Sequence, residues 1–173
     1  MKDVQKFRSF VELLARQHAD VQHTDTSIHF ACTLDDADNA YARTMHYPAV
    51  VLDLGDMNVN PNLEVGRNVT LMFLDHVKDT GSERQKTYAF DRTADIALQF
   101  LAQMERTADT HPEHTFLSRI EISGAQLFRV ELQEAGLYGW VVSLQHTFSM
   151  RSVVCQKVFG SDFEYQLSVL FTP

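Results

Sequence analysis

Two segments of the chain carry histidines or carboxylates that could bind a metal ion. Residues 111–114 read His-Pro-Glu-His, and imidazole and carboxylate groups are ligands that zinc accepts. Asp35, Asp36 and Asp38 offer oxygen ligands for calcium, but this segment lacks the loop glycine and the distal glutamate of an EF-hand. A metal site needs ligands that rigid elements hold in place, so both segments are interpreted as polar loops. We therefore expect no metal ion and no cofactor.

Nucleophilic side chains in the chain lack the neighbours that covalent catalysis requires. Ser143 is not part of a Gly-x-Ser-x-Gly turn, and Cys155 is not part of a Cys-x-x-Cys motif. His146 falls on the apolar side of a predicted strand, where a histidine is usually a core residue. We expect that the protein is not an enzyme. The alternative is a small metal-dependent or hydrolytic enzyme that uses His111, His114 or His146.

Residues 137–154 have the alternation of one long strand with an apolar face and a polar face. The side chains of the apolar face are Tyr138, Trp140, Val142, Leu144, His146, Phe148 and Met150. An amphipathic helix is predicted over residues 92–108, and it is expected to cover this face. Trp140 and Phe148 on the strand, together with Leu101 on the helix, are therefore assigned to the core.

Hydrophobic periodicity predicts the remaining elements. A first amphipathic helix is expected over residues 3–18 and a short helix over 37–45. Strands are expected over residues 28–34, 49–54, 69–77, 85–90, 116–132 and 163–171. Residues 55–68 are rich in Asn, Gly and Pro and are interpreted as a long exposed loop. This order predicts an α+β fold, in which a mainly antiparallel sheet carries two helices on one face.

The strand at residues 116–132 contains a glycine that is expected to interrupt its pairing. The apolar side chains of this strand share one parity and are predicted to share one face: Ile120, Ile122, Phe128, Val130 and Leu132. Gly124 lies among them and is predicted to form a bulge or a bend.

Length and composition indicate one domain over residues 1–173, with residues 155–173 as a candidate C-terminal extension or arm. The net charge is −8 and the sequence has no run of Lys and Arg, which argues against a surface that grips nucleic acid. Two cysteines are too few for a disulfide framework. No apolar run approaches the roughly 20 residues that cross a bilayer, so no membrane association is expected.

The order of elements, together with Tyr138, Gly139 and Trp140 on the long strand, resembles the tail terminator, or tail completion, proteins of long-tailed bacteriophages. It is also similar to related neck proteins and minor tail components. The resemblance covers roughly residues 1–154, and the segment 155–173 departs from a minimal terminator. It implies a structural virion protein without catalytic residues, located at the tail or neck and present in the host cytoplasm during assembly.

The resemblance also implies partners. The protein would form a ring with copies of itself, usually a hexamer, at the head-proximal end of the tail tube. This ring would contact the tail tube protein and the head connector or neck proteins, and genome DNA would pass through it without tight binding. Two segments are expected to supply subunit contacts, the polar loop and the last strand. The residues chosen from them are Asn58, Asn60, Asn62, Arg67, Phe163, Tyr165 and Leu167.

Overall fold

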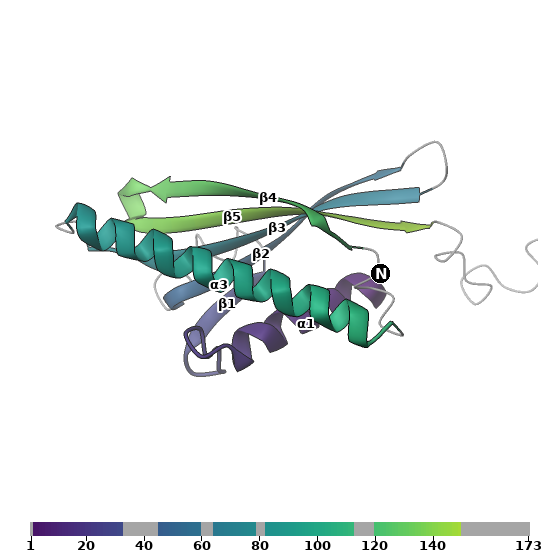
Figure 1. Cartoon of the computed structure of the whole chain (residues 1–173), viewed down its shortest axis with the longest axis horizontal. Helices are drawn as coiled ribbons and strands as arrows, with labels where there is room; N and C mark the ends of the chain where they lie inside the picture. The colour runs from purple at the N-terminus through teal and green to yellow at the C-terminus, as the bar shows by residue number, and fades with distance from the viewer. Residues whose placement is uncertain (1, 33–44, 60–63, 79–81, 113–119, 150–173) are drawn as a thin grey trace, which may run out of the picture.

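A computed structural model of the chain describes residues 2–32, 45–59, 64–78, 82–112 and 120–149. The elements, in chain order, are α1 (Lys2–Gln17), β1 (Ile28–Cys32), β2 (Met45–Val59), β3 (Glu64–His76), α3 (Glu83–Thr110), β4 (Ile120–Leu132), the short 3-10 helix η2 (Gln133–Ala135) and β5 (Leu137–Ser149). Figure 1 shows α3 lying along the length of the sheet. The predicted helix at 37–45 and strand at 163–171 fall outside these residues, except that Met45 begins β2.

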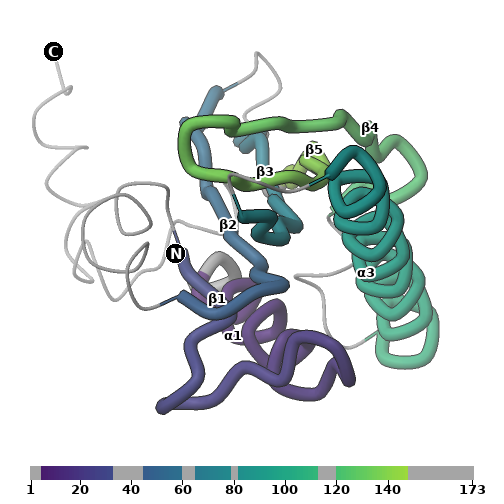
Figure 2. The backbone as a smooth tube through the Cα atoms, turned by 90° about the vertical axis from the view of Figure 1, so that its left-hand side faces the viewer, coloured from purple at the N-terminus to yellow at the C-terminus, as the bar shows by residue number. Residues whose placement is uncertain are grey.

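The five strands form one sheet in the order β1-β2-β3-β5-β4. Only β1 and β2 run parallel, and the other three pairings are antiparallel. Both helices pack on the same face of this sheet, which Figure 2 shows from the end of the molecule. The predicted α+β fold, a mainly antiparallel sheet with two helices on one face, is confirmed.

The main core cluster lies between the helices and the sheet. On α1 and α3, apolar residues recur at steps of three and four, so they form one stripe along each helix. On the strands, every second side chain points to the helices, and these side chains pack against the two stripes. The largest fully buried members are Phe7, Phe73, Phe100, Leu52, Leu71, Ile96 and Met104. Full burial of such a side chain stabilises the fold by roughly 1.5–3 kcal/mol.

β5 is an interior strand, paired with β3 on one side and β4 on the other. Val142, Leu144 and His146 are buried beneath the helices, as the alternation predicts. Trp140 is half-buried, and its indole Nε1 donates a hydrogen bond of 3.0 Å to the carbonyl oxygen of Phe90 on α3. Trp140 therefore contacts α3 before residue 92, the predicted start of this helix, and its side chain is only half-buried.

The other two predicted core residues are Leu101 and Phe148, and the structure describes the side chain of Leu101 alone. Leu101 is half-buried and packs at the margin of the main core cluster. Phe148 pairs with Val65 through the backbone, and its side chain is outside the described part.

The predicted loop over residues 55–68 is wrong, because β2 continues to Val59 and β3 begins at Glu64. Only residues 60–63 of this segment lie outside the described structure. Gly66 and Arg67 pair with Thr147 and His146 of β5, so β3 has a partner on each side here. Pairing of this kind outweighs the low strand propensity of Asn and Gly, because strand propensity depends strongly on context.

The predicted strand over residues 85–90 is also wrong, because α3 begins at Glu83 and not near residue 92. Ser82 is the N-cap, and its backbone N–H donates to Oε1 of Gln85 at 2.8 Å. This hydrogen bond is one of the two that form a capping box. In a sequence, a serine followed three residues later by a glutamine indicates such a box. Ala89, Phe90 and Thr93 then bury one helical face.

β4 carries the predicted interruption, since its pairing with β5 shifts register between Glu121 and Gln126, around Gly124. An irregularity of this kind exchanges the faces of the residues that follow it. Leu127 consequently packs on the helix-side core, whereas Phe128 is 52% exposed. The predicted common face of Ile120, Ile122, Phe128, Val130 and Leu132 is therefore wrong beyond Gly124.

Candidate functional site

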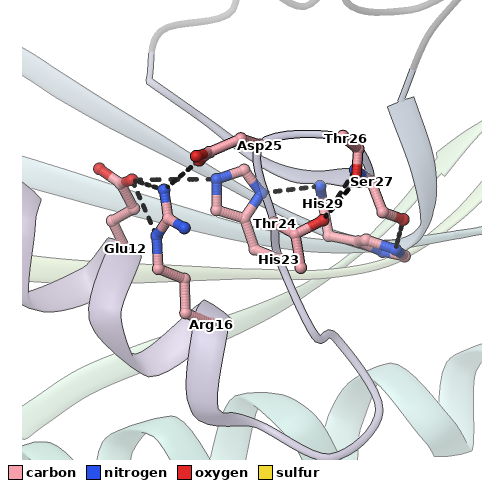
Figure 3. Close-up of polar contacts among 8 residues, drawn as sticks. All are labelled: Glu12, Arg16, His23, Thr24, Asp25, Thr26, Ser27 and His29. Carbon is pink, nitrogen blue, oxygen red and sulfur yellow. Dashed lines mark hydrogen bonds and ion pairs between the residues drawn. The ribbon is translucent and has the colours of Figure 1, made fainter.

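A polar network connects α1 to the segment that enters β1 (Figure 3). Arg16 Nη2 lies 2.9 Å from a carboxylate oxygen of Glu12, one helical turn earlier, and 2.8 Å from one of Asp25. Asp25 is largely exposed, so solvent screens this pair. The hydrogen bond from Arg16 lowers the pKa of the Asp25 carboxyl. The arrangement ties residues 18–27 back onto α1.

His23 is a buried histidine in this network. Its Nδ1 accepts a hydrogen bond of 3.1 Å from the backbone N–H of His29, so the neutral ring carries its proton on Nε2. Nε2 faces the Glu12 carboxylate at 3.9 Å. Burial, and then the nearby Arg16 charge, lower the pKa of His23. The ring is therefore a neutral structural group at pH 7.

Ser27 and His29 form a hydroxyl–imidazole pair. Ser27 Oγ lies 3.1 Å from His29 Nε2, and His29 Nδ1 lies 2.8 Å from the carbonyl oxygen of Pro48 on β2. A carbonyl only accepts, so the imidazole proton is on Nδ1 and Nε2 accepts from the serine. This is the geometry of a nucleophile, a base and a group that orients the base.

The same serine also has a structural role in its turn. Its backbone N–H donates to Oγ1 of Thr24 at 2.9 Å, and its carbonyl accepts from the backbone N–H of Thr24 at 3.0 Å. Hydroxyl groups of Ser and Thr stabilise turns through hydrogen bonds of this type. Sequence analysis missed the pair because its orienting group, the backbone of Pro48, comes from a neighbouring strand and leaves no residue-type signal.

The histidines predicted for the alternative enzyme occupy different settings. His146 is 1% exposed and its ring lies 6.4 Å from that of Phe7 on α1, centroid to centroid. His111 is exposed at the C-terminal cap of α3, and His114 lies outside the described residues. In the part of the chain that the structure covers, no three His, Cys, Asp or Glu side chains are arranged to hold a metal ion.

The residues predicted for subunit contacts lie partly at the end of the β2–β3 hairpin. Asn58 is exposed on β2, and Arg67 is half-buried on β3. Arg67 Nε is buried without a hydrogen-bond acceptor among the described residues. A donor left in this state costs about 1–3 kcal/mol, so it would gain from an added acceptor. The other predicted contact residues lie outside the described structure: Asn60, Asn62, Phe163, Tyr165 and Leu167.

Exposed apolar side chains gather at two separate places on the sheet. At the hairpin end, Met57 is 55% and Val59 is 61% exposed; we call these residues and Arg67 the tip surface. On the edge strand β4, Phe128 is 52% and Leu132 is 42% exposed; we call these two residues the β4 surface. In Figure 1 the β2–β3 hairpin extends beyond the helices, whereas β4 and β5 connect at the opposite end.

Comparison with protein-family models, with curated proteins and with solved structures finds no match to this chain. Among the helices in the described residues, none is long and apolar enough to cross a membrane.

Proposed function

We propose that the protein is a structural component that assembles with copies of itself into a closed ring. The ring is that of a tail terminator or neck protein of a long-tailed bacteriophage, with six subunits. It ends growth of the tail tube, and it joins the tube protein to the head connector. The assignment to a bacteriophage rests on the resemblance to tail terminator proteins, which is based on the order of elements and on Tyr138, Gly139 and Trp140.

The observation that carries the assembly proposal is the presence of two different exposed apolar surfaces on one elongated sheet. Head-to-tail rings need a heterologous contact, in which one surface of a subunit meets a different surface of the next. The tip surface and the β4 surface are separated along the strands, so one subunit can use both at once. In the proposed ring, the tip surface of each copy therefore contacts the β4 surface of its neighbour.

Arg67 gives this contact a polar component. Its cross-strand neighbours are the exposed Met57 on β2 and the buried His146 on β5. A guanidinium next to an apolar contact binds a carboxylate through two parallel hydrogen bonds. The chain has 23 acidic residues against 15 basic ones, so a neighbouring copy offers such groups in excess. A carboxylate of the adjacent subunit would bind the part of the Arg67 guanidinium that reaches the surface.

The charge of the chain suits a ring that DNA traverses. A protein that neutralised many phosphates would hold the duplex and oppose its movement. With a net charge of −8, we expect negligible retention of the protein on duplex DNA at physiological salt. Strong retention under those conditions would remove this part of the proposal.

Electron microscopy of the purified full chain tests the assembly directly. We expect closed rings with a central opening, and native mass spectrometry should give one dominant species of six chains. Light scattering over a range of concentrations serves as an independent measure of size. A protein that remains monomeric at high concentration would contradict the proposal.

A hydrolytic enzyme is the second candidate, and the pair Ser27–His29 favours it more than His111, His114 or His146 do. If the pair is catalytic, the protein should hydrolyse an activated ester, and Ser27→Ala should reduce the rate by 10²-fold or more, about the contribution of a positioned base. Thr24→Ser, which keeps the hydroxyl of the turn, is the matched control. Equal background rates for wild type and Ser27→Ala would exclude this candidate.

A further inference from the structure

A hollow of about 600 Å³ lies between the end of β3 and the first turns of α3. Its floor includes the buried side chains of Val77 and Ala89, and Tyr88 borders it with 65% of its side chain exposed. Pockets for small molecules have this size and combine an apolar surface with a few polar groups. The hollow is separate from both the tip surface and the β4 surface.

Positive charge is concentrated around this hollow, although the protein as a whole is acidic. Lys78, Arg84 and Arg92 line it, against Asp75 as the single acidic side chain among its described lining residues. Arg92 donates to Oδ2 of Asp75 at 3.3 Å, so these two charges offset one another. Lys78 and Arg84 form no ion pair within the described chain. Among the described residues, the hollow therefore presents two cations that no carboxylate compensates.

This cluster is not visible as a run in the sequence. Lys78 follows β3, and Arg84 and Arg92 are two turns apart on α3, so only the return of the helix onto the sheet brings them together. The absence of a Lys and Arg run, which argues against a nucleic-acid grip, does not exclude a compact anion site. Two neighbouring cations fit a small anion better than the extended backbone of a duplex.

We propose that this hollow binds a nucleoside phosphate. The ammonium of Lys78 and the guanidinium of Arg84 would hold the phosphate oxygens through charge-assisted hydrogen bonds. The planar base would stack on the ring of Tyr88, above the small side chain of Ala89. This site goes beyond the proposed assembly function and does not rest on it.

Calorimetric titration of the full chain with ATP tests the site. We expect one ATP per chain, and Lys78→Gln and Arg84→Gln should each weaken binding about tenfold, because each removes a charge-assisted contact. Tyr88→Ala should weaken binding, and Tyr88→Phe should retain it. Arg106→Gln, which removes an exposed arginine from the distal part of α3, is the matched control and should bind as wild type does.

Competing anions separate the ligand classes. Tripolyphosphate that binds as tightly as ATP would overturn the nucleoside assignment, because Tyr88 would then contribute nothing. Duplex DNA bound through Lys78 and Arg84 would assign the cluster to nucleic acid instead. No heat at millimolar ATP, or binding that the double variant leaves unchanged, would overturn the site as a whole. Ring formation, recorded by microscopy on the same samples, is scored separately, so failure of one proposal is distinguishable from failure of the other.

Discussion

His23 makes the stability of the fold depend on pH. Burial lowers the pKa of its ring below the ordinary value of about 6.5, so at mildly acidic pH the unfolded chain binds a proton that the folded chain does not. The free energy of unfolding then falls as the pH drops from about 6.5 towards the lowered folded pKa, and this contribution is fully present above that window. Protonation of Nδ1 would also break the bond from the backbone N–H of His29.

Replacement of the ring isolates this effect. Asparagine can accept the same backbone hydrogen bond but does not titrate, so His23→Asn should remove part of the loss of stability between about pH 7.5 and about pH 5. Urea denaturation at both pH values measures the difference. An identical pH profile for His23→Asn and wild type would contradict the argument.

Gly139 is required for the close approach of β5 to β3. A Cβ at this position would collide with the carbonyl oxygen of Phe73 on the neighbouring strand. Gly139→Ala should therefore lower the free energy of unfolding by about 3 kcal/mol, since backbone atoms must move to admit the methyl group. Gly66→Ala on β3 is the matched control. A Cβ there would meet its nearest atom, in the side chain of Gln145, at 3.6 Å, so thermal denaturation should show a change of only about 0.5 kcal/mol.

At the scale of elements, Trp140 links β5 to the first half of α3. Trp140→Phe keeps most of the ring and removes the bond to the Phe90 carbonyl, which should cost about 1 kcal/mol. Trp140→Ala also removes the packing, and about 3 kcal/mol is expected because the side chain is only half-buried. Denaturation monitored by far-UV circular dichroism measures both. Equal losses for the two variants would show that packing contributes little at this contact.

The elements also show what the sequence could predict. The positions of α1 and β5 can be predicted from the hydrophobic periodicity of their own residues, because each has one apolar stripe. Neither prediction requires knowledge of the neighbouring element. The hairpin end of β2 and β3 could not be predicted in this way, since Gly66 and Arg67 become strand through pairing with β5. The start of α3 is indicated by Ser82 and Gln85, which form its capping interaction, although residues 85–90 are predicted as a strand.

The candidate sites depend on contacts between distant residues, and this is why few of them could be predicted. Ser27 and His29 are close in sequence, yet the orienting carbonyl belongs to Pro48. Phe128 is predicted to share one face with Ile120, and the irregularity around Gly124 places it on the opposite side. Arg67 is predicted to make a subunit contact, and in the structure it lies next to the exposed Met57 on β2.

At the scale of the whole molecule, the proposed head-to-tail contact makes a prediction that an isologous contact does not. Met57→Glu should disable the tip surface and Phe128→Glu the β4 surface, because each places an unpaired charge in an apolar contact. Each variant alone should be monomeric in native mass spectrometry. Leu98→Glu, at a residue that is 54% exposed on α3, should still form rings.

A mixture of the two defective variants distinguishes the contact types. The Phe128→Glu subunit keeps an intact tip surface, and the Met57→Glu subunit keeps an intact β4 surface. One contact between them is therefore restored, and no further subunit can be added at either end. We expect heterodimers of the two variants and no rings. In an isologous arrangement, each surface would instead contact the same surface of a second subunit. Met57→Glu alone would then still dimerise through the β4 surface. Homodimers of either single variant would therefore refute the head-to-tail arrangement.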